Sequence, residues 1–145
     1  MSAVFFAACS DGNFNRTKTG LMYKIISDKK NPVVKNGKVL KFEYKQTIHD
    51  SVLYSSADNG PAFVPIDSTM PLDYNPSEVF ALLRKGDSAV IVIEADTIKK
   101  KSGQLPPFLK PKDKVFLMIR VKDVFASVAA ADTDRQVEIK KVMDK

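Results

Sequence analysis

Two stretches of alternating polarity constrain the fold of this chain more than any other feature. The first covers residues 38–48, where Leu40, Phe42 and Tyr44 share one face and charged residues occupy the other. The second covers residues 114–125, with the same period of two. Such alternation is typical of antiparallel strands that bury one face and expose the other. The chain is therefore predicted to form a sheet with one covered face, onto which Tyr44 points.

Shorter apolar runs bounded by turn residues predict further strands. These runs are residues 21–26, 52–56, 62–66 and 89–95. The last is rich in β-branched residues and nearly continuous, which predicts a central strand. Pro65 restricts its own strand to an edge or a bulge, because proline cannot donate to the ladder.

One helix start is clear in the middle of the chain, at Asn75-Pro76-Ser77-Glu78. Asn is a preferred N-cap, Pro suits the first helical position, and Glu stands where a capping box places it. Gly86 suits the C-cap, so a helix of about ten residues is expected. Residues 97–111 follow the central strand as a long loop, and loops of that length are usually functional or disordered.

Three segments make up the predicted domain organisation. Residues 1–16 form a tether, residues 17–127 form one domain, and residues 128–145 form a helical tail that begins at a Thr133 cap. A length of 145 residues, 44% of them hydrophobic, suits one core. The tail is expected to be a solvated helix, and the alternative is a docking element.

The N-terminal segment places an apolar run directly before the only cysteine, Cys9. Ala7-Ala8-Cys9 resembles the lipobox of bacterial lipoproteins, which predicts lipidation of Cys9 and a membrane anchor in the cell envelope. The location expected is periplasmic or on the outer membrane. The alternative is that Val4 to Ala8 form a buried strand and Cys9 is a core residue.

Charge and ligand counts exclude several classes of function. The formal net charge is +6, but the basic residues are scattered except at Lys99-Lys100-Lys101, and no aromatic residues interleave with that run. This pattern does not favour nucleic-acid binding. One His and one Cys are too few for a structural zinc site, so neither a metal nor another cofactor is expected. His49 is expected to be a solvated surface residue without a catalytic role.

The order of these segments resembles the FKBP family of peptidyl-prolyl isomerases. The resemblance covers about 110 residues, from Thr17 to Ser127, and no single motif carries it. The matching stretches are Thr19 to Ile26, Val39 to Tyr44, Val52 to Ser56, Glu78 to Gly86, Leu105-Pro106-Pro107, and Lys114 to Val121. It implies an α+β fold in which a bent antiparallel sheet of five to six strands wraps around one short α-helix. An apolar cleft between helix and sheet would receive the substrate proline.

At the level of residues, the resemblance implies catalytic roles for Tyr44, Tyr54 and Phe63. It also implies a substrate-binding wall of six residues, namely Leu53, Val64, Leu72, Phe80, Ile98 and Leu117. Phe63 and Val64 are alternatives for one aromatic position of the family. Tyr44, Phe63, Phe80 and Leu117 would also suit a plain core, because burial alone explains both roles.

The function implied is prolyl isomerisation that assists the folding of exported proteins, with proline-containing polypeptides as partners. The alternative is an FKBP-like chaperone, or an accessory subunit of an envelope complex, that binds such segments without turnover. Two departures motivate this alternative: Pro76 stands where the family has a tryptophan, and Ile98 or Lys99 where it has a tyrosine. A hydrolase is disfavoured, because no Ser/His/Asp or Cys/His set can be assembled around one His.

Overall fold

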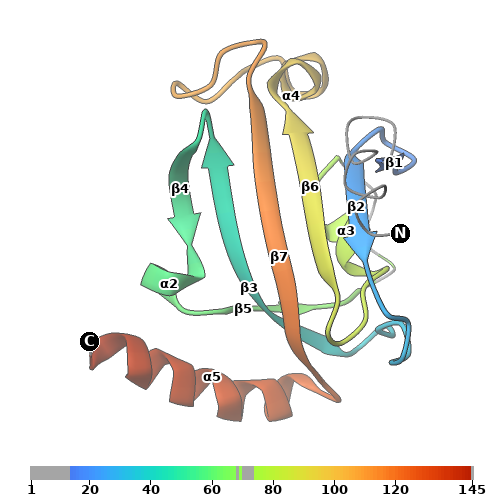
Figure 1. Cartoon of the computed structure of the whole chain (residues 1–145), viewed down its shortest axis with the longest axis vertical. Coiled ribbons are helices and arrows are strands. Elements are labelled where there is room, and N and C mark those ends of the chain that lie inside the picture. Colours follow the sequence, from blue (N-terminus) through green and yellow to red (C-terminus); the bar gives the residue numbers. More distant parts are fainter. Residues whose placement is uncertain (1–13, 68, 70–73, 145) are drawn as a thin grey trace.

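A bent antiparallel sheet dominates the computed structural model, which describes residues 14–67, 69 and 74–144 (Figure 1). Cys9 and Leu72 therefore lie outside the described residues. The strands are β1 (Asn15–Arg16), β2 (Met22–Ile26), β3 (Val39–Ile48), β4 (Ser51–Ser55), β5 (Ala62–Pro65), β6 (Ser88–Glu94) and β7 (Lys114–Phe125). Their order is β1-β2-β6-β7-β3-β4, and β5 pairs with the other end of β3. The predicted strands are confirmed, and the two-residue β1 brings the sheet to seven.

The core lies on one face of this sheet, as the alternation predicted. Leu40 and Phe42 of β3 are buried, and Phe42 pairs with Val121 of β7, which is also buried. β6 lies between β2 and β7 and contributes the fully buried Ile91. The central position predicted for this apolar run is therefore confirmed.

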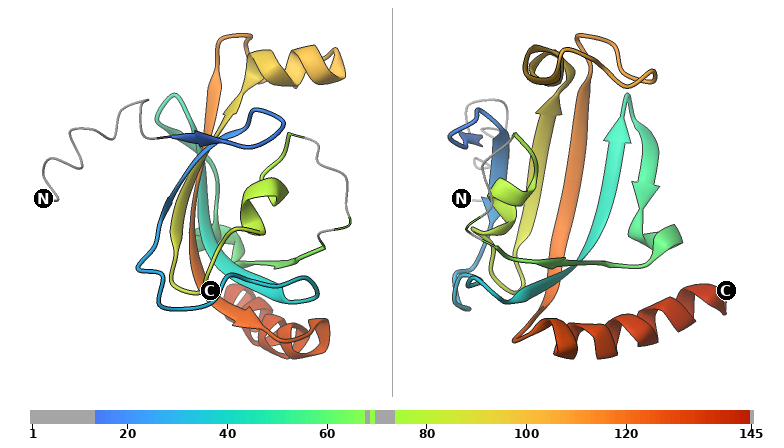
Figure 2. Two further views of the ribbon diagram at one scale, coloured as in Figure 1. Left: turned by 90° about the vertical axis from the view of Figure 1, so that its right-hand side faces the viewer. Right: turned by 180° about the vertical axis from the view of Figure 1, so that it is seen from behind.

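Four described helices accompany the sheet: α2 (Ser56–Asn59), α3 (Ser77–Phe80), α4 (Ala95–Ser102) and α5 (Val128–Met143). Figure 2 shows α3 against the concave side of the sheet, with α4 leaning to the same side at one end. The two helices thus frame one side of β3, β7 and β6. α5 crosses the opposite end of the molecule (Figure 1).

The helix α3 is shorter than the ten residues that its capping signals predicted. The Asn75 side chain does accept a hydrogen bond from the Ser77 N–H, at 2.8 Å. Glu78, however, does not close a capping box; its carboxylate accepts hydrogen bonds from the hydroxyls of Thr17 and Thr19. The carbonyl of Leu83 accepts from the backbone N–H of Val34, so tertiary pairing ends the helical turn early. Propensity is overridden in this way when a neighbouring segment supplies better partners.

The prediction of a loop over residues 97–111 was wrong for its first part, which is the end of α4. Gly103 ends this helix in the left-handed conformation, with φ of 81°, and its N–H bonds to the Lys99 carbonyl at 2.7 Å. Glycine accepts this conformation without steric strain. At the other end, the Ala95 N–H donates to the Asp113 carbonyl at 3.0 Å, which anchors the helix to the start of β7.

The C-terminal helix α5 begins at a Ser127 cap, six residues before the predicted Thr133 cap. The Ser127 hydroxyl accepts from the Ala130 N–H, whereas the Thr133 hydroxyl bonds within the helix to the Ala129 carbonyl. The helix includes Ala129 to Ala131, since alanine is the best helix former. No described helix is both long and apolar enough to cross a bilayer.

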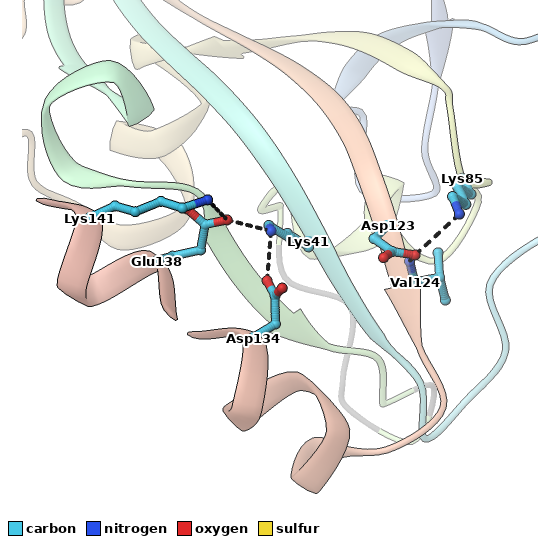
Figure 3. Close-up of polar contacts among 7 residues, drawn as sticks. All are labelled: Lys41, Lys85, Asp123, Val124, Asp134, Glu138 and Lys141. Atoms are coloured by element: carbon cyan, nitrogen blue, oxygen red, sulfur yellow. Dashed lines mark hydrogen bonds and ion pairs between the residues drawn. The ribbon is translucent and has the colours of Figure 1, made fainter. Parts of the chain in front are cut away.

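The helix α5 is mostly exposed, as predicted for the tail, but one side of it contacts the sheet. Ala131 is buried, and the Lys41 ammonium on β3 lies 2.6 Å from carboxylate oxygens of both Asp134 and Glu138 (Figure 3). Burial lowers the pKa of Lys41, but the hydrogen bonds from this ammonium to Asp134 and Glu138 outweigh it, so the net pKa is raised. The helix is therefore tied to the sheet by charge as well as by packing.

Candidate functional site

A row of three aromatic side chains crosses the concave face of the sheet toward α3. Phe42 is buried; its ring centroid lies 6.4 Å from that of Tyr44, edge to face, and 5.0 Å from that of Phe80 on α3. Period two places Phe42 and Tyr44 on the same face of β3. Edge-to-face and tilted contacts of this kind stabilise aromatic pairs beyond area burial alone. Tyr44 is only half buried, so it forms the accessible end of the row.

The backbone of Tyr44 is held where β4 gives way to α2. Its N–H donates to the Ser56 hydroxyl at 3.0 Å, and that hydroxyl lies 3.3 Å from the Tyr44 carbonyl, to which it donates. One side chain thus satisfies both backbone groups of Tyr44. These two hydrogen bonds hold the backbone of Tyr44 in place, although Tyr44 has no paired residue on β4.

Tyr74 contributes a second tyrosine to this side of the molecule, and the sequence analysis did not identify it. Its side chain is 7% exposed and belongs to the main core cluster with Phe42 and Phe80. Its hydroxyl oxygen accepts a hydrogen bond from the Glu94 N–H at 2.9 Å. The available signal was an aromatic residue immediately before Asn75-Pro76, a position that packs against the first helical turn.

Aliphatic residues from four elements complete the surroundings of the row. Val64 of β5, Leu117 of β7 and Ile98 of α4 all pack against the main cluster. Ile98 also packs against a second cluster under α4, to which Leu53 contributes. The structure thus brings five of the predicted site residues, Tyr44, Val64, Phe80, Ile98 and Leu117, to one cluster, and places Leu53 in the neighbouring one.

Phe63 does not join that cluster, because it lies on the opposite face of β5. It pairs with Lys41, whose side chain faces α5, and its ring stacks on Phe125 at 6.1 Å. The Lys41 ammonium and the Arg135 guanidinium lie 5.7 and 5.3 Å from its ring centroid. Of the two alternatives for this position, only Val64 therefore faces the concave side.

Tyr54 is also separate from the row. It is 59% exposed on β4, whereas its neighbour Leu53 packs inward. Alternation along the strand accounts for the difference, because successive side chains point to opposite faces. The structure therefore does not bring Tyr54 and Phe63 together with Tyr44, and Leu72 lies outside the described residues.

His49, which follows β3, forms a polar pair with Asp113, which precedes β7. His49 Nε2 lies 2.8 Å from Asp113 Oδ1, and the Lys110 N–H donates to the other carboxylate oxygen at 2.8 Å. The hydrogen bond from Lys110 lowers the pKa of Asp113, burial opposes this, and the contact with His49 lowers it further; the net pKa is lowered. This geometry holds a loop in place and presents no nucleophile. Among the described residues, no three His, Cys, Asp or Glu side chains form a group suited to a metal ion.

A groove of about 500 Å³ lies on the other face of the same strands. Its lining includes Glu43, Lys45, Met118 and Arg120, which alternate with the inward residues of β3 and β7. That groove is therefore lined by charged side chains among apolar ones such as Ile26 and Val90. The concave face offers instead what a proline ring requires, apolar and aromatic walls with few polar groups.

Known proteins share this architecture although their sequences differ. No family model matches the sequence, and no curated protein sequence is similar enough to count as a relative. The structure is similar to FkpA from Escherichia coli, with a TM-score of 0.59 and 20% identity over 86% of this chain and 57% of that one. It is similar to a peptidyl-prolyl cis-trans isomerase from Pseudomonas syringae pv. tomato, with a TM-score of 0.57 and 12% identity over 86% and 90% of the two chains.

At these identities the likeness concerns the fold, and the chain spans little more than half of the FkpA chain. Both comparisons extend over most of the residues that form the sheet and the helices facing it. The FKBP-like α+β fold that the sequence predicted is therefore confirmed.

Proposed function

We propose that this protein is a peptidyl-prolyl cis-trans isomerase that acts on proline-containing polypeptides. The observation that carries the proposal is the row Phe42, Tyr44 and Phe80 on the concave face, beside Ile98 and Leu117. A peptidyl-prolyl cis-trans isomerase with the same fold supports it.

Such a site needs no acid, base or nucleophile. Rotation about an X-Pro bond breaks no covalent bond, and its barrier of about 18–20 kcal/mol comes from amide resonance. The twisted transition state has lost conjugation, so its carbonyl carries less charge than in the planar ground state. An apolar pocket that excludes water stabilises the twisted state relative to the planar one, which is catalysis by differential binding. In this proposal Tyr44 and Phe80 hold the proline ring, and Val64, Ile98, Leu117 and Leu53 form the walls.

Tyr74 is assigned to the floor of the pocket. Pro76 stands where the FKBP family has a tryptophan, and the chain contains no Trp. Tyr74 is the buried aromatic residue two positions earlier, fixed by its hydrogen bond with Glu94. A phenol ring is smaller than an indole, so the site would be roomier than in the family.

The test is catalysis of isomerisation in proline peptides and of a proline-limited refolding reaction. Tyr44→Ala should lower kcat/KM by about tenfold, equivalent to about 1.4 kcal/mol of transition-state stabilisation. Lys45→Ala is the matched control, because Lys45 is the next residue of β3, is exposed, and points to the opposite face of the strand. No acceleration by the wild-type protein over the uncatalysed rate would refute the proposal.

A second candidate function is binding without turnover, as a chaperone or an accessory subunit of an envelope complex. It is favoured by α4, which carries Ile98 and Lys99 where the family has a tyrosine, so that a hydrogen-bond donor of that kind is replaced. Proline peptides that bind by calorimetry but isomerise at the uncatalysed rate would select this function. Peptide turnover would exclude it.

The location proposed is the cell envelope, with the chain attached through a lipidated Cys9. The support is the Ala7-Ala8-Cys9 sequence. Mass spectrometry of the mature N-terminus in a bacterial host tests the assignment: a diacylglyceryl Cys9 is expected, and an unmodified Cys9 in a chain that retains residues 1–8 would reject it.

A further inference from the structure

The end of the molecule that carries α4 is strongly basic. Residues 95–114 contain six lysines and two aspartates, and so hold four of the chain's net charge of +6. All six lysines are exposed: Lys99, Lys100, Lys101, Lys110, Lys112 and Lys114. One of the two aspartates, Asp113, is buried and pairs with His49. We call the six lysines together with Phe108 the basic end.

The helices at the two ends of the molecule differ in charge. Figure 1 shows α4 and the loop that follows it at one end of the sheet and α5 at the other. Within α5 the three basic and three acidic side chains balance, and several of them pair with one another or with Lys41. The helix α5 therefore adds no net charge to its end of the molecule, although the segment between β2 and β3 brings Lys29, Lys30 and Lys35 there.

A large aromatic side chain belongs to the same segment as these lysines. Phe108 is 58% exposed, between Pro107 and the buried Leu109. The loop around it is anchored, because Leu105 and Leu109 pack into the cluster under α4 and the Leu109 N–H donates to the Pro106 carbonyl at 3.0 Å. Phe108 is thus held outward by a loop whose two leucines pack inward.

We propose that the basic end binds an anionic lipid surface, with Phe108 inserted among the lipid headgroups. Lysines near an anionic membrane are each attracted to it, and their long side chains let apolar stems lie at the interface. An exposed aromatic ring gains by leaving water for the headgroup boundary, and together the two features are those of a peripheral membrane site. Charge complementarity selects anionic rather than zwitterionic lipid. The proposal is independent of isomerase activity and of a lipid on Cys9.

The test uses the full chain with Cys9→Ser, so that no acyl chain contributes, and with Phe108→Trp as a fluorescent reporter. Because the natural chain has no Trp, this residue supplies the only indole signal. Vesicles of phosphatidylcholine containing phosphatidylglycerol should shift the emission to the blue, and brominated lipid should quench it. Vesicles of phosphatidylcholine alone should do neither, and high salt should release the protein by screening.

Charge variants test whether the basic end binds the vesicles specifically or whether any exposed lysines of this cationic protein would do so. K99Q/K100Q/K101Q should weaken partitioning by about 100-fold, from the attraction expected per lysine. The matched control K29Q/K30Q/K35Q removes three exposed lysines from the segment between β2 and β3, at the other end of the sheet (Figure 1), and should change it little. With the natural residue at 108 as reference, Phe108→Ser should weaken sedimentation with anionic vesicles and Phe108→Leu should preserve it.

Three results would overturn the proposal. These are an emission spectrum that anionic vesicles leave unchanged, an equal loss of binding in the two triple variants, and binding to soluble polyglutamate without binding to vesicles. The last would assign the basic end to acidic polypeptides. Equal unfolding midpoints across the variants, measured alongside, show that each outcome concerns the surface rather than the fold.

Discussion

The ammonium of Lys41, on strand β3, lies 2.6 Å from the Asp134 carboxylate on the C-terminal helix α5 (Figure 3). A second carboxylate, that of Glu138, lies equally close to this ammonium, whose side chain is 14% exposed. The pair joins residues far apart in sequence, and it fixes α5 over the face of β3 that carries Lys41. Lys41 therefore contributes to the contact between α5 and the sheet.

Replacing Lys41 by Met should lower the free energy of unfolding by about 1–3 kcal/mol, because two partly buried carboxylates lose their counter-charge. Urea denaturation followed by circular dichroism measures the change. Lys45→Met, at an exposed position of the same strand, should stay within about 0.5 kcal/mol of the wild type. Equal effects of the two substitutions would show that the ion pairs contribute nothing.

The same ion pairs predict a loss of stability in alkali. The folded-state pKa of Lys41 is raised above 10.5, so its contribution is fully present below pH 10.5 and is lost as the pH rises through the folded-state value. The difference in urea midpoint between the wild type and Lys41→Met should therefore shrink in that range. A difference that stays constant with pH would contradict the assignment.

Asp113 predicts the opposite dependence in acid. Its folded-state pKa is lowered below 3.8, mainly by the hydrogen bond from the Lys110 N–H, so its contribution is present above pH 3.8 and is lost as the pH falls through the folded-state value. In the Asp113→Asn variant, the urea midpoint should therefore fall less steeply as the pH is lowered through this range. Asp58→Asn, at an exposed position, should leave this fall as in the wild type.

Tyr74→Phe should destabilise the protein by about 1–3 kcal/mol, because the Glu94 N–H loses its acceptor. Tyr54→Phe is the control, since the Tyr54 side chain is largely exposed, and it should be nearly neutral. Thermal unfolding of both variants provides the comparison. A neutral Tyr74→Phe would mean that water replaces the phenol oxygen.

Gly60→Ala should destabilise by about 1–3 kcal/mol, because φ of 81° with ψ of 164° is a conformation nearly restricted to glycine. A Cβ at this position would also lie 3.1 Å from a Val142 methyl carbon on α5. Gly103→Ala, in the left-handed helical region with no neighbour within 4 Å, should be milder. Val142→Ala in the Gly60→Ala background isolates the contact with α5, and a double-mutant cycle without coupling would rule that contact out.

Much of the sheet could be predicted from the sequence, because burial of alternate residues is a local property of a strand. The boundaries of β7 match the predicted range of residues 114–125, and Tyr44 lies on the predicted face. The resemblance to FKBP proteins likewise placed Phe80, Ile98 and Leu117 near that face. The strand predictions depend on periodicity along the chain, whereas these three residues were implied by the resemblance.

Tertiary structure decided the rest, because the remaining questions concern pairing between distant segments. Whether Phe63 or Val64 faces the core depends on the register of β5 against β3, and a shift of one residue exchanges the two faces. The length of α3 depends on Val34, which takes the Leu83 carbonyl, and the docking of α5 depends on Lys41. Local sequence specified the main strands, because alternation is local, whereas contacts between distant segments specified the helix boundaries and which side chains face the candidate site.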